Sequence, residues 1–139
     1  MSTEIRPELS EKNKYWIPKH RYYELKHFCL QYPDWKKVYA ALDAWPGETG
    51  RIGTGGKAGT LPNPTENLAL RRASLFNKMH IVELAAQETD ESLALYILLG
   101  VTQGCSYTSL RTRLNIPCCR DVYYDLYRKF FWILNRSRN

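Results

Sequence analysis

The sequence predicts an all-α fold, and three observations support this class. Apolar residues recur at helical spacing in several segments, no stretch sustains the apolar–polar alternation of a strand, and Gly or Pro follows several of the periodic segments. The 139 residues, 44% of them hydrophobic, are enough to bury one core without disulfides or a metal ion. We expect a small helical domain with an N-terminal helical hairpin, a long central helix and a C-terminal helix-turn-helix.

An aromatic helical hairpin is predicted for residues 1–45. Apolar residues at helical spacing place its first helix over Pro18–Tyr32 and its second over Asp34–Leu42. Pro33 disfavours the α conformation at the residue before it. The two helices should therefore meet at an angle.

The aromatic residues of this hairpin are interleaved with Lys and Arg. Helix packing or a subunit interface is the commoner use of such a mixture, because Tyr and Trp give a large contact area at a small cost in entropy. We expect that use here, which makes the protein a candidate homodimer, and stacking on unpaired bases is the alternative. The aromatic residues are Tyr15, Trp16, Tyr22, Tyr23, Phe28, Tyr32, Trp35 and Tyr39.

A flexible loop is predicted for residues 46–64. This segment holds six of the eight Gly and three of the seven Pro, and it has no aromatic residue. Such a composition cannot bury enough apolar surface to become ordered by itself. We interpret the segment as a hinge, and a loop that becomes ordered on a partner is the alternative.

Two further helices are predicted at the start of residues 65–139. A long helix begins near Pro64 and runs to about Gln87. Asp90 caps the next helix and Gly104 stops it, and the density of apolar residues predicts that this helix is buried on most sides. The buried stripes are Leu68, Leu75, Met79, Val82 and Ala86 on the first helix, and Leu93, Ile97, Leu98 and Val101 on the second.

A helix-turn-helix is predicted for residues 106–135. Ser106 is a good N-cap for a short helix, which Asn115 and Pro117 end, because Asn tolerates a left-handed turn and Pro disfavours the α conformation before it. A second helix follows from about Cys118 to Asn135. The inward residues are Tyr107, Leu110 and Leu114 on the first helix, and Tyr123, Leu126, Tyr127, Phe130, Ile133 and Leu134 on the second.

The positive charge of the chain is concentrated in this last segment. The formal net charge is +6 and the isoelectric point is near 9.2. From Leu110 to Asn139 there are seven Lys or Arg and only two acids, and six of the seven are Arg. Arg presents a planar fork of donors that suits phosphate or guanine. An acidic partner such as nucleic acid is therefore expected, and a solvated basic face is the alternative.

Double-stranded DNA is the partner that a basic second helix after a short turn favours. On that helix Arg120, Tyr124 and Arg128 should face outward and meet bases or phosphates. On the preceding helix Arg111 and Arg113 should position the DNA backbone. The predicted DNA-binding residues are Arg111, Arg113, Arg120, Tyr124, Arg128 and Lys129.

A family resemblance rests on the run YILLGVTQGCSYTSLRTRLNIPCCRDVYYDLYRKFFWIL, particularly on Gly104, Leu110, Leu114 and Ile116-Pro117. The segment Glu91–Asn139 resembles the C-terminal part of small phage-encoded proteins related to late-transcription activators of the RinA/ArpU kind, which in turn resemble the DNA-binding region 4 of sigma factors. The resemblance implies a helix-turn-helix, a DNA-binding regulator of late phage genes, and RNA polymerase as a further partner. It does not extend to the first 65 or so residues.

The sequence offers little for catalysis or cofactor binding. The glycine-rich stretch Gly53–Ala58 follows no strand and precedes Pro62, where a nucleotide site would need a helix. The His and Cys residues lack the usual spacing of zinc ligands, and no nucleophile is placed beside a base. We expect no enzyme and no cofactor.

The expected location is the cytoplasm. No apolar run approaches the roughly 18 residues of a membrane span. Met1–Glu11 has three Glu and no apolar stretch, which predicts neither a secretory signal nor a transit peptide.

The alternative function is a non-enzymatic protein-binding module, for example a phage inhibitor of a host defence nuclease of the CRISPR type, whose basic surface would occupy an acidic or nucleic-acid-binding groove.

Overall fold

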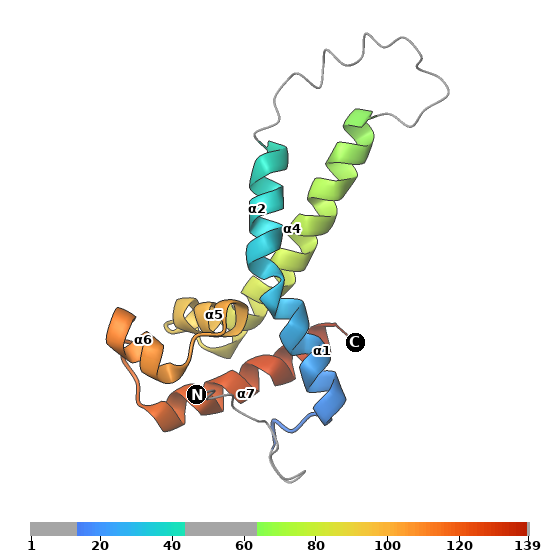
Figure 1. The fold of residues 1–139 in the computed structure, drawn as a ribbon. Helices are drawn as coiled ribbons and strands as arrows, with labels where there is room; N and C mark the ends of the chain where they lie inside the picture. The colour runs from blue at the N-terminus through green and yellow to red at the C-terminus, as the bar shows by residue number, and fades with distance from the viewer. Residues whose placement is uncertain (1–13, 44–63, 139) are drawn as a thin grey trace. The chain divides into compact units, whose positions relative to one another are not determined.

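The computed structural model describes residues 14–43 and 64–138, which form helices and no strand (Figure 1). The predicted all-α class is confirmed. Apart from Pro64, the predicted loop over residues 46–64 lies outside the described residues. The helices are α1 (Lys19–Leu30), α2 (Tyr32–Asp43), α4 (Pro64–Thr89), α5 (Ala94–Gln103), α6 (Tyr107–Leu114) and α7 (Arg120–Ser137).

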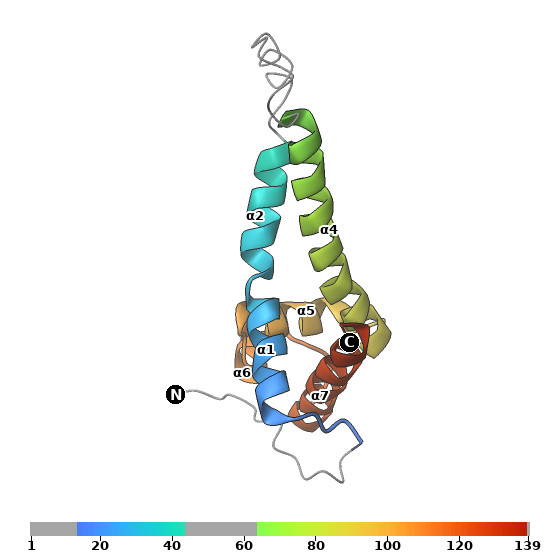
Figure 2. The same ribbon diagram turned by 90° about the vertical axis from the view of Figure 1, so that its right-hand side faces the viewer.

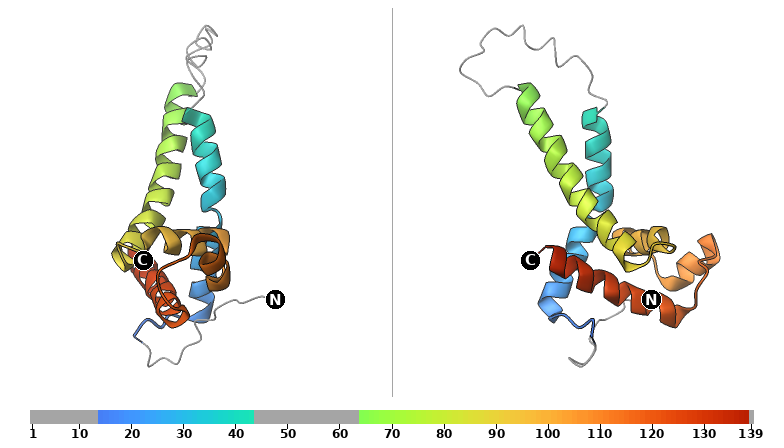
Figure 3. Two further views of the ribbon diagram at one scale, coloured as in Figure 1. Left: turned by 90° about the vertical axis from the view of Figure 1, so that its left-hand side faces the viewer. Right: turned by 180° about the vertical axis from the view of Figure 1, so that it is seen from behind.

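The chain divides into two compact units. The first unit comprises residues up to Pro33 and from Ile81 onward, and the second comprises Asp34–His80. In the first unit α1 packs on α5 and α7. In the second unit α2 and the first part of α4 run side by side in all views (Figures 1, 2 and 3). This grouping differs from the predicted division, which kept residues 1–45 together, because the apolar face of α1 is buried on α5 and α7.

The core of the first unit lies where α1 meets α7. Tyr22 and Leu25 of α1 are fully buried, as are Phe130 and Phe131 of α7. The Tyr22 and Phe131 rings meet edge to face with centroids 5.1 Å apart, and the Tyr22 hydroxyl lies 2.9 Å from that of Tyr127. Burial of several large rings supplies most of the apolar area that stabilises a small domain.

The second unit has a much thinner core. Among the described residues of Asp34–His80, the buried apolar ones are Trp35 and Met79. Aromatic contacts join the two helices, since the Tyr39 and Phe76 rings have centroids 6.3 Å apart and the Arg72 guanidinium lies 4.5 Å from the Tyr39 centroid. Cation–π contacts at such partly exposed sites contribute roughly 0.5–1 kcal/mol each.

The break between the first two helices falls at Gln31. The prediction that Pro33 keeps Tyr32 out of a helix is wrong, because α2 begins at Tyr32. Pro33 then occupies the first turn of α2, where a missing backbone N–H costs no intrahelical hydrogen bond. The Tyr32 hydroxyl donates a short hydrogen bond to the Glu83 carboxylate of α4.

The predicted long helix is confirmed as α4, which runs to Thr89. Asp90 does not cap α5 directly. Its carboxylate instead accepts hydrogen bonds from the backbone N–H groups of Ser92 and Leu93, one turn before α5 begins. The prediction that this helix is buried on most sides is wrong at Leu95, which is 64% exposed, because α5 packs on its neighbours through the stripe that contains Ile97 and Val101.

Candidate nucleic-acid interface

The candidate interface is built on α6, the turn after it and the start of α7. Ser106 caps α6 as predicted, since its Oγ accepts a hydrogen bond of 3.1 Å from the Ser109 N–H. The helix ends at Asn115, which adopts the predicted left-handed conformation with φ of 55°. Ile116 is then fully buried, and its N–H lies 3.4 Å from the Leu110 carbonyl. These local contacts define the corner between the two helices.

Tyr107 ties the start of α6 to α7. Its hydroxyl donates to the Cys118 carbonyl at 2.6 Å, and its backbone N–H donates to the Tyr124 hydroxyl at 3.2 Å. The Tyr107 ring also packs against Tyr123, with centroids 5.9 Å apart. Two hydrogen bonds and a ring contact from one residue hold the short helix α6 against α7.

Three exposed arginines gather around this corner, and we call them the basic tip: Arg111, Arg113 and Arg120. Each of them donates a hydrogen bond to a neutral oxygen, and none is paired with a carboxylate in the described part of the chain. The bonds run from Arg111 to the Ile116 carbonyl at 3.0 Å, from Arg113 to Ser109 Oγ at 3.4 Å, and from Arg120 to Thr108 Oγ1 at 3.2 Å. Their positive charges are therefore not neutralised by acids among the described residues.

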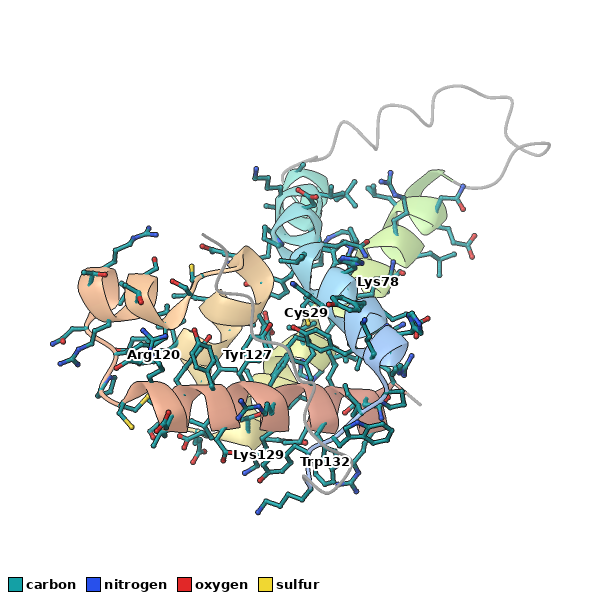
Figure 4. The ribbon with its side chains drawn as sticks, turned by 60° about the horizontal axis from the view of Figure 1, so that its bottom comes forward. Cys29, Lys78, Arg120, Tyr127, Lys129 and Trp132 are labelled. Carbon is teal, nitrogen blue, oxygen red and sulfur yellow. The ribbon has the colours of Figure 1, made fainter. Side chains whose placement is uncertain are left out.

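Arg120 is the most constrained member of the basic tip. Its guanidinium carbon lies 5.4 Å from the centroid of the Tyr107 ring and 6.0 Å from that of the Tyr124 ring. Figure 4 shows Arg120 between α6 and the first turn of α7. The guanidinium is held by two rings and one hydroxyl, and its remaining N–H groups are left for an external acceptor. Because the side chain is already restrained, binding such an acceptor costs less conformational entropy.

The rest of the predicted outward face of α7 is turned toward the protein. Tyr124 is half-buried and its hydroxyl is used by Tyr107. Arg128 is half-buried, and its Nε is inaccessible and has no hydrogen-bond partner among the described residues. The periodicity of α7 alone could not reveal this, because the helix contacts α1, α5 and α6 and so has more than one buried side.

Lys129, the remaining predicted residue, is half-buried and lies close to Asp90. The Ser92 hydroxyl, which donates to Asp90 at 2.8 Å, is the main cause of the lowered pKa of that carboxyl, and the positive charge of Lys129 contributes to it. The structure therefore separates Lys129 from the basic tip and gives it an anionic neighbour.

The exposed side of α7 near its start is acidic. Asp121, Val122 and Asp125 are all exposed. Asp121 and Asp125 are four residues apart and so share a face of the helix. Carboxylates on this face would oppose DNA phosphates, so a nucleic acid would have to meet the tip from the side of α6.

The turn also departs from the usual motif. Residues 115–119 connect α6 to α7, which begins at Arg120, two residues after the predicted start near Cys118. The turns of DNA-binding helix-turn-helix motifs are commonly about three or four residues long. Leu114, predicted to face inward, is instead 46% exposed at the last residue of α6, and Ile116 beyond the turn is the buried residue of this corner.

The thiols near the turn are not arranged as a reactive or metal site. Burial is the main cause of the raised pKa of the Cys118 thiol, which keeps it protonated at neutral pH. Among residues 14–43 and 64–138 no three His, Cys, Asp or Glu side chains are grouped so as to hold a metal ion.

In the same ranges no helix combines the length and apolar character that a membrane crossing needs.

Comparison of the chain with protein-family models, with curated proteins and with solved structures finds no match.

Proposed function

We propose that the chain binds double-stranded DNA through the basic tip. The observation that carries the proposal is the set of three exposed arginines on α6 and the first turn of α7, each bonded to a neutral oxygen and none to a carboxylate among the described residues. Arginine forks suit phosphate oxygens and the guanine edge. Thr108 on the same helix is exposed, and its hydroxyl, which accepts from Arg120, keeps its own O–H as a further donor to a phosphate backbone.

The proposed interface is smaller than the one that sequence reasoning favours. It keeps Arg111, Arg113 and Arg120 and leaves out Tyr124, whose hydroxyl is used by the Tyr107 N–H, and Arg128, whose Nε is buried. Arg120 is the member best placed for a base edge, because its stacking on two rings limits the conformations it must lose on binding. Arg111 and Arg113 would then contact the backbone.

A regulatory role completes the proposal. The resemblance of Glu91–Asn139 to phage late-transcription activators supports a cytoplasmic regulator of phage genes that acts with RNA polymerase. Binding as a homodimer would place two half-sites about one or more helical turns apart on the DNA.

The test is duplex binding by fluorescence anisotropy, with a fragment library from the neighbourhood of the gene, at 50 and 200 mM salt. Replacing one phosphate-binding arginine of the tip should lower affinity by roughly tenfold near 100 mM salt and reduce the slope of log K against log salt by about one. The variants are Arg111→Gln, Arg113→Gln and Arg120→Gln. The matched control is Arg71→Gln, which removes the same charge from an exposed position on α4.

Equal reductions of affinity in the control and tip variants would overturn the assignment to the tip. A preferred fragment whose preference disappears with Arg120→Gln would assign base readout to that residue. If no duplex binds near physiological salt, DNA binding is excluded.

The acidic side of α7 is the observation that favours a protein-binding module, although one that would bind through this side and not, as the sequence predicts, through its basic surface. Exposed Val122 lies between exposed Asp121 and Asp125, a combination that suits a basic protein surface better than a nucleic acid. For a protein-binding module that inhibits a host nuclease, Asp121→Asn with Asp125→Asn should weaken nuclease inhibition, and the tip variants should leave it unchanged.

A further inference from the structure

A second surface of the first unit combines aromatic rings with positive charge. Tyr15, just before α1, meets Trp132 of α7 with ring centroids 5.6 Å apart and planes inclined by 59°. The Lys14 ammonium lies 5.1 Å from the Tyr15 centroid, and the Arg136 guanidinium lies 4.9 Å from the Trp132 centroid. We call these four residues the aromatic patch. Both rings are half-buried and both cations are exposed.

The patch is held by the core beneath it. Ile17, two residues after Tyr15, is 4% exposed, and Phe131, next to Trp132, is 1% exposed. Arg21 of α1 also donates from Nε to the Asn135 side-chain oxygen of α7 at 2.7 Å. The rings are thus carried by anchored backbone and do not depend on one another for their position.

The packing of α1 on α7 gathers charge that is far apart in the sequence. Glu24 is the single acid in Lys14–Leu30 and Trp132–Arg138, and it lies 3.2 Å from Arg21. Such a concentration of like charge is unfavourable by itself and is relieved by an anionic ligand. The Lys and Arg residues of these two segments are Lys14, Lys19, Arg21, Lys26, Arg136 and Arg138.

We propose that the aromatic patch binds single-stranded nucleic acid. Tyr and Trp rings that keep part of their surface accessible beside cations are what nonspecific single-strand binding uses, because every base has a face that stacks on a ring and every nucleotide has a phosphate. The planar guanidinium of Arg136, which lies over the Trp132 ring, offers a further flat group to a base.

The chemistry of the patch distinguishes its ligand from that of the basic tip. In a duplex the base faces are stacked inside the helix, so a duplex could use the cations of the patch but not its rings. The two sites also lie toward opposite ends of α7, as Figure 4 shows for Arg120 and Trp132. At 1.5 Å per residue, Arg120 and Arg136 are separated by roughly 24 Å along the helix. The proposal therefore goes beyond duplex binding and can fail independently of it.

The experiment uses the full chain and a twelve-residue thymidine oligonucleotide, followed by anisotropy and by quenching of tryptophan fluorescence. Lys14→Gln and Arg136→Gln change exposed side chains, and each should weaken oligonucleotide binding severalfold and reduce its salt dependence. Tyr15→Ala should weaken it about tenfold through loss of stacking. Trp132→Phe should retain part of the affinity but remove most of the quenching, which assigns the signal to that ring and not to another tryptophan.

Arg113→Gln on the basic tip is the matched control, since it removes one charge from the same unit. It should leave oligonucleotide binding unchanged, and the patch variants should leave duplex binding by the tip unchanged. Retained affinity in Arg136→Gln and Tyr15→Ala, quenching that survives Trp132→Phe, or complete competition by an equal length of duplex would each overturn the proposal. Thermal unfolding of every variant identifies losses of affinity that arise from misfolding. If a ring variant misfolds, the affinities of Lys14→Gln and Arg136→Gln decide whether the patch binds the oligonucleotide.

Discussion

At the scale of single residues, Gly100 and Tyr123 form a tight contact in the core of the first unit. Gly100 lies inside α5 and is buried, and a Cβ there would overlap the Tyr123 hydroxyl. Tyr123 is 1% exposed, its hydroxyl has no hydrogen-bond partner among the described residues, and burial is the main cause of its raised pKa. Close packing of α5 on α7 therefore depends on the missing side chain of one glycine.

We predict that Gly100→Ala lowers the free energy of unfolding by about 1–3 kcal/mol, the usual cost of overpacking a core. This predicted loss of stability is opposite to the ordinary effect of the substitution, because replacing Gly by Ala inside a helix normally stabilises a protein by roughly 0.5–1 kcal/mol. Tyr123→Phe should be nearly neutral, since it removes a hydroxyl that makes no bond to the described residues. Urea unfolding measures these differences.

The double variant that combines Gly100→Ala with Tyr123→Phe supplies the control. With the hydroxyl removed, the nearest Tyr123 atom to the new methyl would be Cζ at 3.2 Å, so Tyr123→Phe should recover much of the stability. Additive effects of the two substitutions would show that the hydroxyl is not the cause.

At the scale of helices, short-range chemistry sets where each one begins and ends. The turn between α4 and α5 is held by the Asp90 carboxylate, which accepts from Ser92 and from the Leu93 N–H at 3.0 Å. The Ser92 hydroxyl is the main cause of the lowered pKa of Asp90. A carboxyl whose pKa is lowered in the folded state contributes stability above its unfolded-state pKa of about 3.9, and that contribution is lost as the pH falls below it.

We predict that Asp90→Ala costs about 1 kcal/mol of unfolding free energy at pH 7, the usual value of a capping carboxylate. The difference from the natural chain should shrink as the pH is lowered from 4 toward 2, because the natural chain then loses the same charge. Urea unfolding at several pH values measures both trends. Asp125→Ala, at an exposed position on α7, should cause little change, and an undiminished Asp90→Ala effect at pH 2 would contradict the charge explanation.

At the scale of the whole molecule, the two units differ greatly in buried apolar surface. In the part of Asp34–His80 that the structure describes, the buried apolar side chains are Trp35 and Met79, whereas the first unit buries several rings and aliphatic residues from α1, α5 and α7. A segment that buries less apolar surface unfolds locally at a lower free-energy cost.

We therefore predict that backbone amides of α2 and of α4 before Ile81 exchange with deuterium well before those of α1, α5 and α7. Hydrogen exchange followed by mass spectrometry at neutral pH tests this. Equal protection in both units would show that they unfold as one cooperative body. Protection of the second unit that rises with protein concentration would instead indicate that a second copy covers it.

The all-α class, the long helix α4, the Ser106 cap and the left-handed residues Gly104 and Asn115 follow from the sequence by itself. Caps and turns use atoms only a few residues apart, so the local sequence is sufficient to predict them.

Only the tertiary structure decided which polar side chains remain available. Tyr124 and Arg128 lie on a regular stripe of α7, yet they face the protein because α7 contacts helices on several sides. The basic tip and the aromatic patch likewise join residues from different segments of the chain, such as Arg113 of α6 with Arg120 of α7, and Tyr15 before α1 with Trp132 of α7. The periodicity of a helix shows which of its faces are polar. It does not show which other helices contact those faces, because long-range packing determines those contacts.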